Sequence, residues 1–158
     1  MANYQKLQTS TAINIVKSDN ANIPNVGIVT SGTGVAPIAN QLEDSSTGAF
    51  ITKNVQTGDI VYNVTTGTAA TVTNVIDEDN LTLNANIFSG VSNVYIIYSS
   101  NSKEGCVLYI GSGGDLTVLT AGGQRVLFSN VLGGTFLPVQ ILKVFSTGTT
   151  ASNFVALW

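Results

Sequence analysis

Few side chains in this sequence can take part in catalysis. The 158 residues include no histidine, one cysteine and nine acids. Without histidine, neither a Ser-His-Asp nor a Cys-His catalytic group can form, and no zinc site of the usual ligand types can be assembled within one chain. The lone Cys106 begins an apolar strand and is expected to be a buried hydrophobic residue. We therefore predict that the protein is not an enzyme and has no catalytic, cofactor-binding or metal-binding residues.

Three patterns resemble known site motifs, but each lacks a part that the chemistry needs. The turn at residues 111–115 follows a strand, as a phosphate-binding loop does, yet no Lys-Ser/Thr pair and no predicted helix follow it. Asp77, Glu78 and Asp79 offer carboxylates to a hard cation, but the spacing and loop glycine of an EF-hand are absent. The remaining acids form no evident pair for glycoside hydrolysis. We interpret the first pattern as a hairpin turn and the second as a solvated turn.

The composition favours a protein that works within an assembly. Only 9% of the residues are charged, 44% are hydrophobic and the net charge is −3. The six lysines and arginines are spread along the chain and form no basic surface for nucleic-acid phosphates. No apolar stretch approaches the roughly 20 residues that span a bilayer, and no signal peptide is visible, so we expect synthesis in the cytoplasm without secretion. Sparse charge is typical of surfaces that are buried in permanent interfaces.

The spacing of apolar residues and turns predicts an all-β fold. No segment shows a 3.6-residue apolar period longer than two turns, and short runs of β-branched and aromatic residues alternate with turns rich in Gly, Asn, Ser and Thr. Gly67 is expected in a left-handed turn conformation. The expected strands are 11–16, 60–63, 71–76, 81–83, 92–100, 106–110, 116–120, 125–128, 137–145 and 154–158.

The chain divides into three regions. Residues 1–48 carry weak periodicity and many turn residues, which predicts an extended N-terminal arm, with a loose strand pair on its own domain as the alternative. Residues 49–100 and 106–158 each carry a series of short strands, which predict one or two small β-sandwich or barrel lobes. Residues 101–105 are the expected linker. Because each lobe is near the lower size limit of an independent fold, a shared core is the alternative.

Short motifs in the C-terminal third resemble a segment that recurs in small virion proteins. These motifs are Gly114-Asp115, Gly134–Val139, Thr147–Ala151 and Ala156–Trp158, separated by strands. They are similar to segments of virion proteins of tailed bacteriophages and of gene-transfer agents. Residues 58–83 also resemble a module of marine-phage structural proteins, so that the resemblances together cover residues 49–158.

The resemblance implies a virion structural protein on the head surface, in head decoration or at the base of a head spike. It implies a capsid decoration (cement) protein that binds the outside of the head and stabilises the shell. The expected partners are the major capsid protein and further copies of the chain, as a homotrimer or, alternatively, a pentamer. No contact with nucleic acid or membrane is expected. A receptor- or glycan-binding module of a head spike or tail fibre is the alternative function.

We expect contacts with the capsid or with other subunits on the arm and near the aliphatic end of the chain. Residues 11–16 would complete a neighbour's sheet by strand addition. Pro138 lacks a backbone donor and suits a strand edge that faces a partner, while Arg125 is the expected polar contact. The alternative is that the apolar members of this set fill the core of the C-terminal lobe. The predicted interface residues are Ile13, Ile15, Val16, Arg125, Phe136, Leu137, Pro138, Val139 and Trp158.

Overall fold

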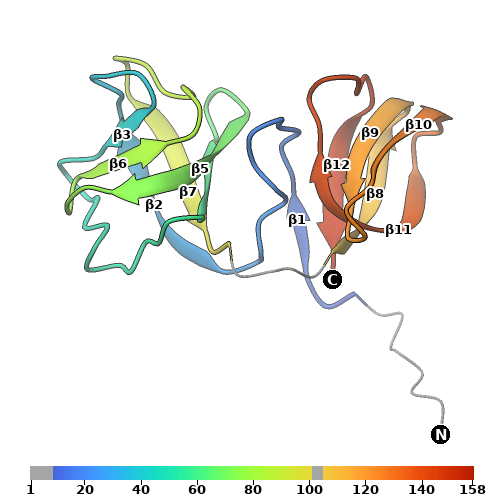
Figure 1. Ribbon diagram of the computed structural model, residues 1–158, viewed down its shortest axis with the longest axis horizontal. Coiled ribbons are helices and arrows are strands. Elements are labelled where there is room, and N and C mark those ends of the chain that lie inside the picture. The colour runs from blue at the N-terminus through green and yellow to red at the C-terminus, as the bar shows by residue number, and fades with distance from the viewer. Residues whose placement is uncertain (1–8, 101–104) are drawn as a thin grey trace, which may run out of the picture.

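The fold consists of two antiparallel six-stranded sheets, as a computed structural model shows for residues 9–100 and 105–158 (Figure 1). In these residues it contains no helix, and so none that is long and apolar enough to cross a membrane. The prediction of an all-β fold is confirmed. The predicted linker, residues 101–105, lies outside the described residues except for Gly105.

The first sheet is built from the middle of the chain and curls around its own core. Its strand order is β2-β7-β4-β5-β6-β3. A bridge between Val35 and Glu43 joins the two edge strands at one end, so the sheet nearly closes on itself. We call this sheet and its loops the first lobe. Its strands are β2 (Ile28–Gly34), β3 (Gln41–Glu43), β4 (Ile60–Asn63), β5 (Thr68–Val75), β6 (Asn80–Leu83) and β7 (Asn93–Tyr98).

The second sheet combines the C-terminal strands with one strand from the start of the chain, in the order β1-β12-β8-β11-β9-β10. Strand β11 lies between β8 and β9: residues 135–137 and Ile141 pair with β8, and Ile141, Lys143 and Val144 pair with β9. The register with β8 shifts between Leu137 and Ile141, a stretch that contains Pro138, which has no backbone N–H to give to a ladder. This sheet and its loops form the second lobe. Its strands are β1 (Ala12–Asn14), β8 (Cys106–Ser112), β9 (Gly114–Thr120), β10 (Arg125–Val131), β11 (Thr135–Val144) and β12 (Ser152–Leu157).

The extended N-terminal segment ends near residue 27, not at residue 48 as the sequence predicts. Residues 28–43 supply β2 and β3 to the first lobe. Strand β2 shows no apolar alternation because it places glycine where its backbone lies against other side chains. A Cβ on Gly32 would lie 2.5 Å from the Asp44 carboxylate, and one on Gly34 would lie 2.5 Å from the Leu42 side chain. The prediction failed here because glycines occupy these closely packed positions, whereas apolar residues there would have indicated a strand.

Residues 9–27, which we call the strap, run between the two lobes (Figure 1). On one side, β1 pairs with β12, and the Ser18 N–H donates to the Val144 carbonyl at 2.9 Å. On the other side, the Ser18 hydroxyl donates to the Ala69 carbonyl of the first lobe at 3.0 Å. Residues 11–16 were predicted to add a strand to a neighbouring subunit, but in the structure Ala12–Asn14 completes a sheet of its own chain.

A small apolar cluster lies beneath the strap at the lobe junction. It is distinct from the main core of either lobe. The Tyr62 and Tyr98 rings meet edge to face, with their centroids 5.2 Å apart, a geometry that adds to the stabilisation from burial. Together with the hydrogen bonds of Ser18, this cluster links the two lobes. Its members are Ala21, Ile60, Tyr62, Ala69 and Tyr98, with Val16 and Ile96 partly buried against them.

Asp44 is a carboxylate that is only 2% exposed, within the first lobe. Its Oδ1 accepts hydrogen bonds from the Ser46 and Thr47 N–H groups and from the Ser46 hydroxyl. Its Oδ2 accepts the hydroxyls of Thr47 and Tyr95 at 2.7 and 2.8 Å. Burial opposes ionisation, but these hydrogen bonds outweigh it and lower the pKa of Asp44 to about 2. The network joins the loop after β3 to the core strand β7.

We expect strong acid to weaken the first lobe through Asp44. Because its pKa in the fold, about 2, lies below the ordinary value of 3.8, the ionised carboxylate stabilises the fold above pH 3.8, and this contribution is lost as the pH falls through about 2. The loss is on the order of 2 kcal/mol, since one pKa unit corresponds to ~1.4 kcal/mol. Urea denaturation at about pH 4 and about pH 2 measures it. Asp44→Asn should lose less stability than the wild type over this range, and equal losses would contradict the assignment.

Candidate interaction surface

The outward face of the second sheet is apolar across four adjacent strands. Residues of β12 and β8 alternate, so that Phe154, Ala156 and Leu108 fill the core while their sequence neighbours face outward. The strand registers set these outward residues side by side in two rows. The rows are Phe136, Tyr109, Val155 and Asn14, and beside it Val107, Leu157 and Ala12. We call these seven residues the outer face; none of them is charged.

Phe136 is the most exposed large apolar residue of the outer face, with 61% of the residue accessible to solvent. It follows Gly134, whose φ of 76° is a left-handed turn conformation that favours glycine. Its ring lies 5.3 Å from that of Tyr109, centroid to centroid, at an interplanar angle of 56°. A large apolar ring left in water has an unfavourable hydration free energy, which contact with a partner would relieve.

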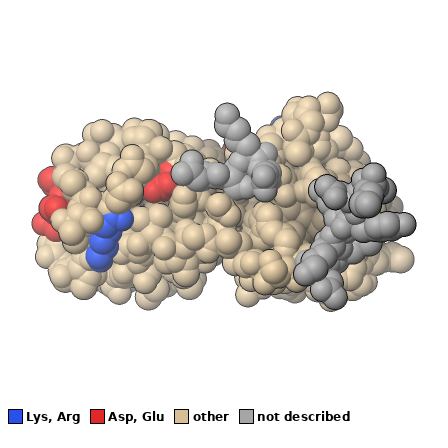
Figure 2. Space-filling view, turned by 90° about the horizontal axis from the view of Figure 1, so that it is seen from below, with Lys and Arg blue, Asp and Glu red and all other residues tan. Residues whose placement is uncertain are grey.

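Charged side chains gather on the first lobe. Figure 2 shows red and blue groups there, whereas the described surface of the second lobe in that view is almost wholly uncharged. Asp77 and Glu78 contribute to the acidic end, and both act within loops: Asp77 accepts hydrogen bonds from Asp79 and Asn80, and Glu78 from Ile51 and Thr52. On the face that Figure 2 shows, the described surface of the second lobe therefore offers less electrostatic repulsion and a smaller desolvation cost on association than that of the first.

The predicted interface residues divide between the core and the surface. Phe136 and Pro138 are exposed on β11, and Arg125 is exposed at the start of β10. The apolar residues between and around them face inward because alternate residues of a strand point to opposite sides. The inward set is Ile13, Ile15, Leu137, Val139 and Trp158 in or against the second-lobe core, and Val16 against the junction cluster.

Sequence reasoning missed the other apolar members of the outer face: Val107, Tyr109, Val155 and Leu157. The signal that could have found them is the absence of polar alternation in β8 and β12, where both sets of alternate residues are apolar. A strand with this pattern is covered on both faces in many proteins, whereas a strand with one solvated face alternates.

Arg125 lies over an aromatic ring of its own lobe. Its guanidinium carbon is 4.3 Å from the centroid of the Phe145 ring, within the range of a cation–π contact. The contact holds the guanidinium on the outward side of the sheet. The hydrogen bonds from Thr147 lower the pKa of the Asp19 carboxyl, and the nearby charge of Arg125 adds to this effect.

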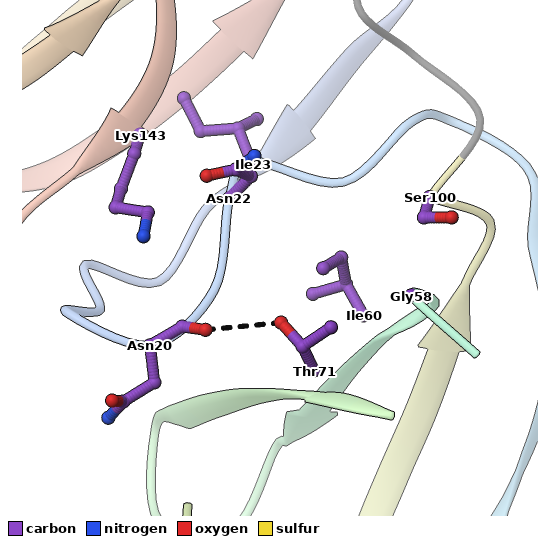
Figure 3. A pocket seen from close by; sticks show the side chains of 8 residues that line it. All are labelled: Asn20, Asn22, Ile23, Gly58, Ile60, Thr71, Ser100 and Lys143. Carbon is purple, nitrogen blue, oxygen red and sulfur yellow. Dashed lines mark hydrogen bonds between the residues drawn. The ribbon is translucent and has the colours of Figure 1, made fainter. Parts of the chain in front are cut away.

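Two crevices flank the strap at the lobe junction. Figure 3 shows the smaller one, about 140 Å³, in which the Thr71 hydroxyl donates to the Asn20 carbonyl at 3.1 Å and Lys143 reaches in from β11. The Lys143 ammonium group donates to the Asp19 carbonyl at 3.3 Å. The larger crevice, about 360 Å³, is mainly apolar and includes Val16, Tyr62 and Ile96. The contacts of Asn20 and Asp19 join the strap to the two lobes, and the residues that line the two crevices do not bring together a nucleophile and a base.

The groups that could do chemistry are not arranged for it in the described residues. Cys106 is buried, as predicted, and burial raises the pKa of its thiol to about 12, so it is protonated near neutral pH. The described acids and cysteine form no cluster of three that could hold a metal ion. No family model, curated protein or solved structure matches the chain. The outer face is thus the feature from which a function is best argued.

Proposed function

We propose that the chain is a virion structural protein of a tailed phage, a decoration protein that binds the outside of the head and stabilises the shell. The observation that carries the proposal is the uncharged, mainly apolar outer face with the exposed Phe136 at one end. The motif Gly134–Val139, through which the sequence resembles small virion proteins, is the segment that presents this ring. The resemblance and the surface thus point to the same part of the chain.

The energetic argument rests on repetition. Burying apolar surface stabilises an interface by about 25 cal/mol per Å², so a single small contact is weak. A decoration protein repeats that contact at every site of the lattice and bridges neighbouring capsid subunits, which adds resistance to internal pressure. In this proposal the major capsid protein covers the outer face.

Replacing Phe136 by serine should reduce binding to heads by about tenfold or more, since it removes the most exposed aromatic side chain of the face. Co-sedimentation of the purified chain with heads that lack it measures occupancy, and thermal disruption of the decorated heads measures stabilisation. Val94→Ser is the matched control, because Val94 is an exposed apolar residue of the first lobe. A wild-type chain that does not bind heads, or a Phe136→Ser variant that binds as well, would count against the proposal.

A receptor- or glycan-binding module is the second candidate, and one observation favours it. The exposed ring of Phe136 and the half-buried ring of Tyr109 lie together on a sheet face, and sugars stack on such rings. A glycan array separates the two functions, because a decoration protein should give no specific signal on it. Specific glycan binding that Phe136→Ser abolishes would favour recognition over head binding.

A further inference from the structure

The larger of the two crevices at the lobe junction has the size of a ligand site. Its volume is about 360 Å³, and pockets that bind small molecules range from about 300 to about 1,000 Å³. The strap contributes Ile13 and Val16 to its lining, and the first lobe contributes residues of β4, of β7 and of the turn after β4. The crevice therefore lies between segments that are far apart in the sequence.

The lining of this crevice is apolar and uncharged. Ile13, Val16 and Ile96 are partly buried, and Val64 is 52% exposed at the rim. None of the described residues that line it carries a charge. A neutral apolar molecule would cover this surface favourably, whereas an ion would lose its hydration and meet no opposite charge. The lining therefore favours a neutral ligand.

Tyr98 supplies the crevice with one unpaired polar group. The residue is only 8% exposed, and it lines the crevice. Within the described part of the chain its hydroxyl has no hydrogen-bond partner, whereas the Tyr62 hydroxyl beside it accepts the Val16 N–H at 3.4 Å. Buried polar groups are nearly always paired, so the Tyr98 hydroxyl is an exception that a ligand could satisfy.

The Tyr98 hydroxyl is suited to donate a hydrogen bond. Its oxygen is not one of the unpaired side-chain atoms that are sealed from solvent, which in the described residues are Gln41 Oε1 and Trp158 Nε1. A ligand in the crevice can therefore reach it. Burial raises the pKa of Tyr98, so the phenol keeps its proton near neutral pH.

We propose that the crevice binds a small neutral molecule that is apolar except for one hydrogen-bond acceptor, such as an aryl ketone. The acceptor takes the hydrogen bond of the Tyr98 hydroxyl, and the apolar part lies against Val16 and Ile96. The site does not depend on the proposed function, because the strap and the first lobe line it and Phe136 does not. Failure to bind heads would leave it unaffected.

Acetophenone is a suitable probe, because it combines one aromatic ring with one carbonyl acceptor. Nuclear magnetic resonance of the full chain, titrated to about 10 mM acetophenone, should show saturable shifts of the Val16, Val64 and Ile96 amides with a dissociation constant of about 1 mM or lower. Tyr98→Phe deletes only the unpaired hydroxyl, so its urea midpoint should equal that of the wild type. Its affinity for acetophenone should fall about fivefold, the effect of one neutral hydrogen bond.

A second probe separates the hydrogen bond from a change of shape. In α-methylstyrene a CH₂ group replaces the ketone oxygen, so this compound keeps the shape but offers no such acceptor. Tyr98→Phe should weaken acetophenone and leave the affinity for α-methylstyrene unchanged. The comparison is made between the two proteins for each probe, as in a double-mutant cycle, because the two compounds also differ in hydrophobicity.

Two further variants locate the site. Val64→Asp places a charge at the rim and should weaken both probes about fivefold or more. Phe136→Ser, which removes an exposed apolar residue from the outer face, is the matched control and should change neither affinity. The absence of saturable shifts, or shifts that Phe136→Ser abolishes, would overturn the proposal. It would also be overturned if Tyr98→Phe weakened the two probes equally or weakened neither.

Discussion

Leu108→Ala should lower the free energy of unfolding of the second lobe by about 3 to 5 kcal/mol, the range for a large buried aliphatic residue cut to alanine. Leu108 is fully buried on β8, between Ala156 of β12 and Leu137 of β11. These neighbours belong to a sheet whose ladders hold them in place, so they cannot close the cavity fully. Fluorescence of Trp158, the one tryptophan, reports the transition because it packs against the same core.

The adjacent residue provides the control for this cavity. Val107 lies on the outer face, so Val107→Ala also shortens an aliphatic side chain, by two carbons instead of three, without opening the core and should cost about 1 kcal/mol or less. If both variants lose the same stability in urea, the assignment of inward and outward faces is wrong. If Leu108→Ala leaves the free energy of unfolding unchanged, the second lobe has no fixed core.

Asp44→Ala should cost about 3 kcal/mol or more of unfolding free energy in the first lobe, because hydrogen bonds to a charged group contribute about 1.5 to 3 kcal/mol each and their buried donors would lose their acceptor. The Tyr95 hydroxyl and the Thr47 N–H lose their partner in the core. Urea denaturation followed by far-ultraviolet circular dichroism measures the loss.

Tyr95→Phe divides the network of Asp44 into its parts. It removes one donor and leaves the carboxylate with the four hydrogen bonds from Ser46 and Thr47. The expected loss is about 1.5 kcal/mol, the lower end of the range for one hydrogen bond to a charged group, because the carboxylate keeps its other partners. Should Tyr95→Phe prove as damaging as Asp44→Ala, the aromatic core around the tyrosine would be the important element, and the carboxylate would be secondary.

The strands of the second lobe could be predicted within a few residues, because Gly- and Ser/Thr-rich turns separate them at regular intervals. Gly67 has the expected left-handed conformation, with a φ of 66°. Strands β2 and β3 could not be predicted, since Gly32 and Gly34 stand where apolar residues would have marked the pattern. These glycines lie against the side chains of Asp44 and Leu42. Contacts of this kind cannot be inferred from the pattern of neighbouring residues in the sequence.

The candidate surface was predictable only in part. The motif Gly134–Val139 contains Phe136, which is exposed, and Leu137, which is in the core. Composition and spacing cannot tell these two apart, because adjacent strand residues point to opposite sides and either could face inward. The pairing of β11 with β8 decides it, and with it the place of Tyr109 beside Phe136. The edge position of β10 likewise follows from sheet order, which no local pattern contains.

The pairing of β1 with β12 also constrains the order in which the protein can fold during synthesis. Strand β1 leaves the ribosome early, but the strand that it pairs with, Ala12 against Leu157, is made after all the others described here. The first lobe has its whole sheet available long before, so it can fold while the second is still being translated. Until β12 is synthesised, Ile13 and Ile15 cannot pack into the second-lobe core, and β1 can pair with a wrong strand. The second lobe therefore closes last, in a step of high contact order that we expect to be the slow one.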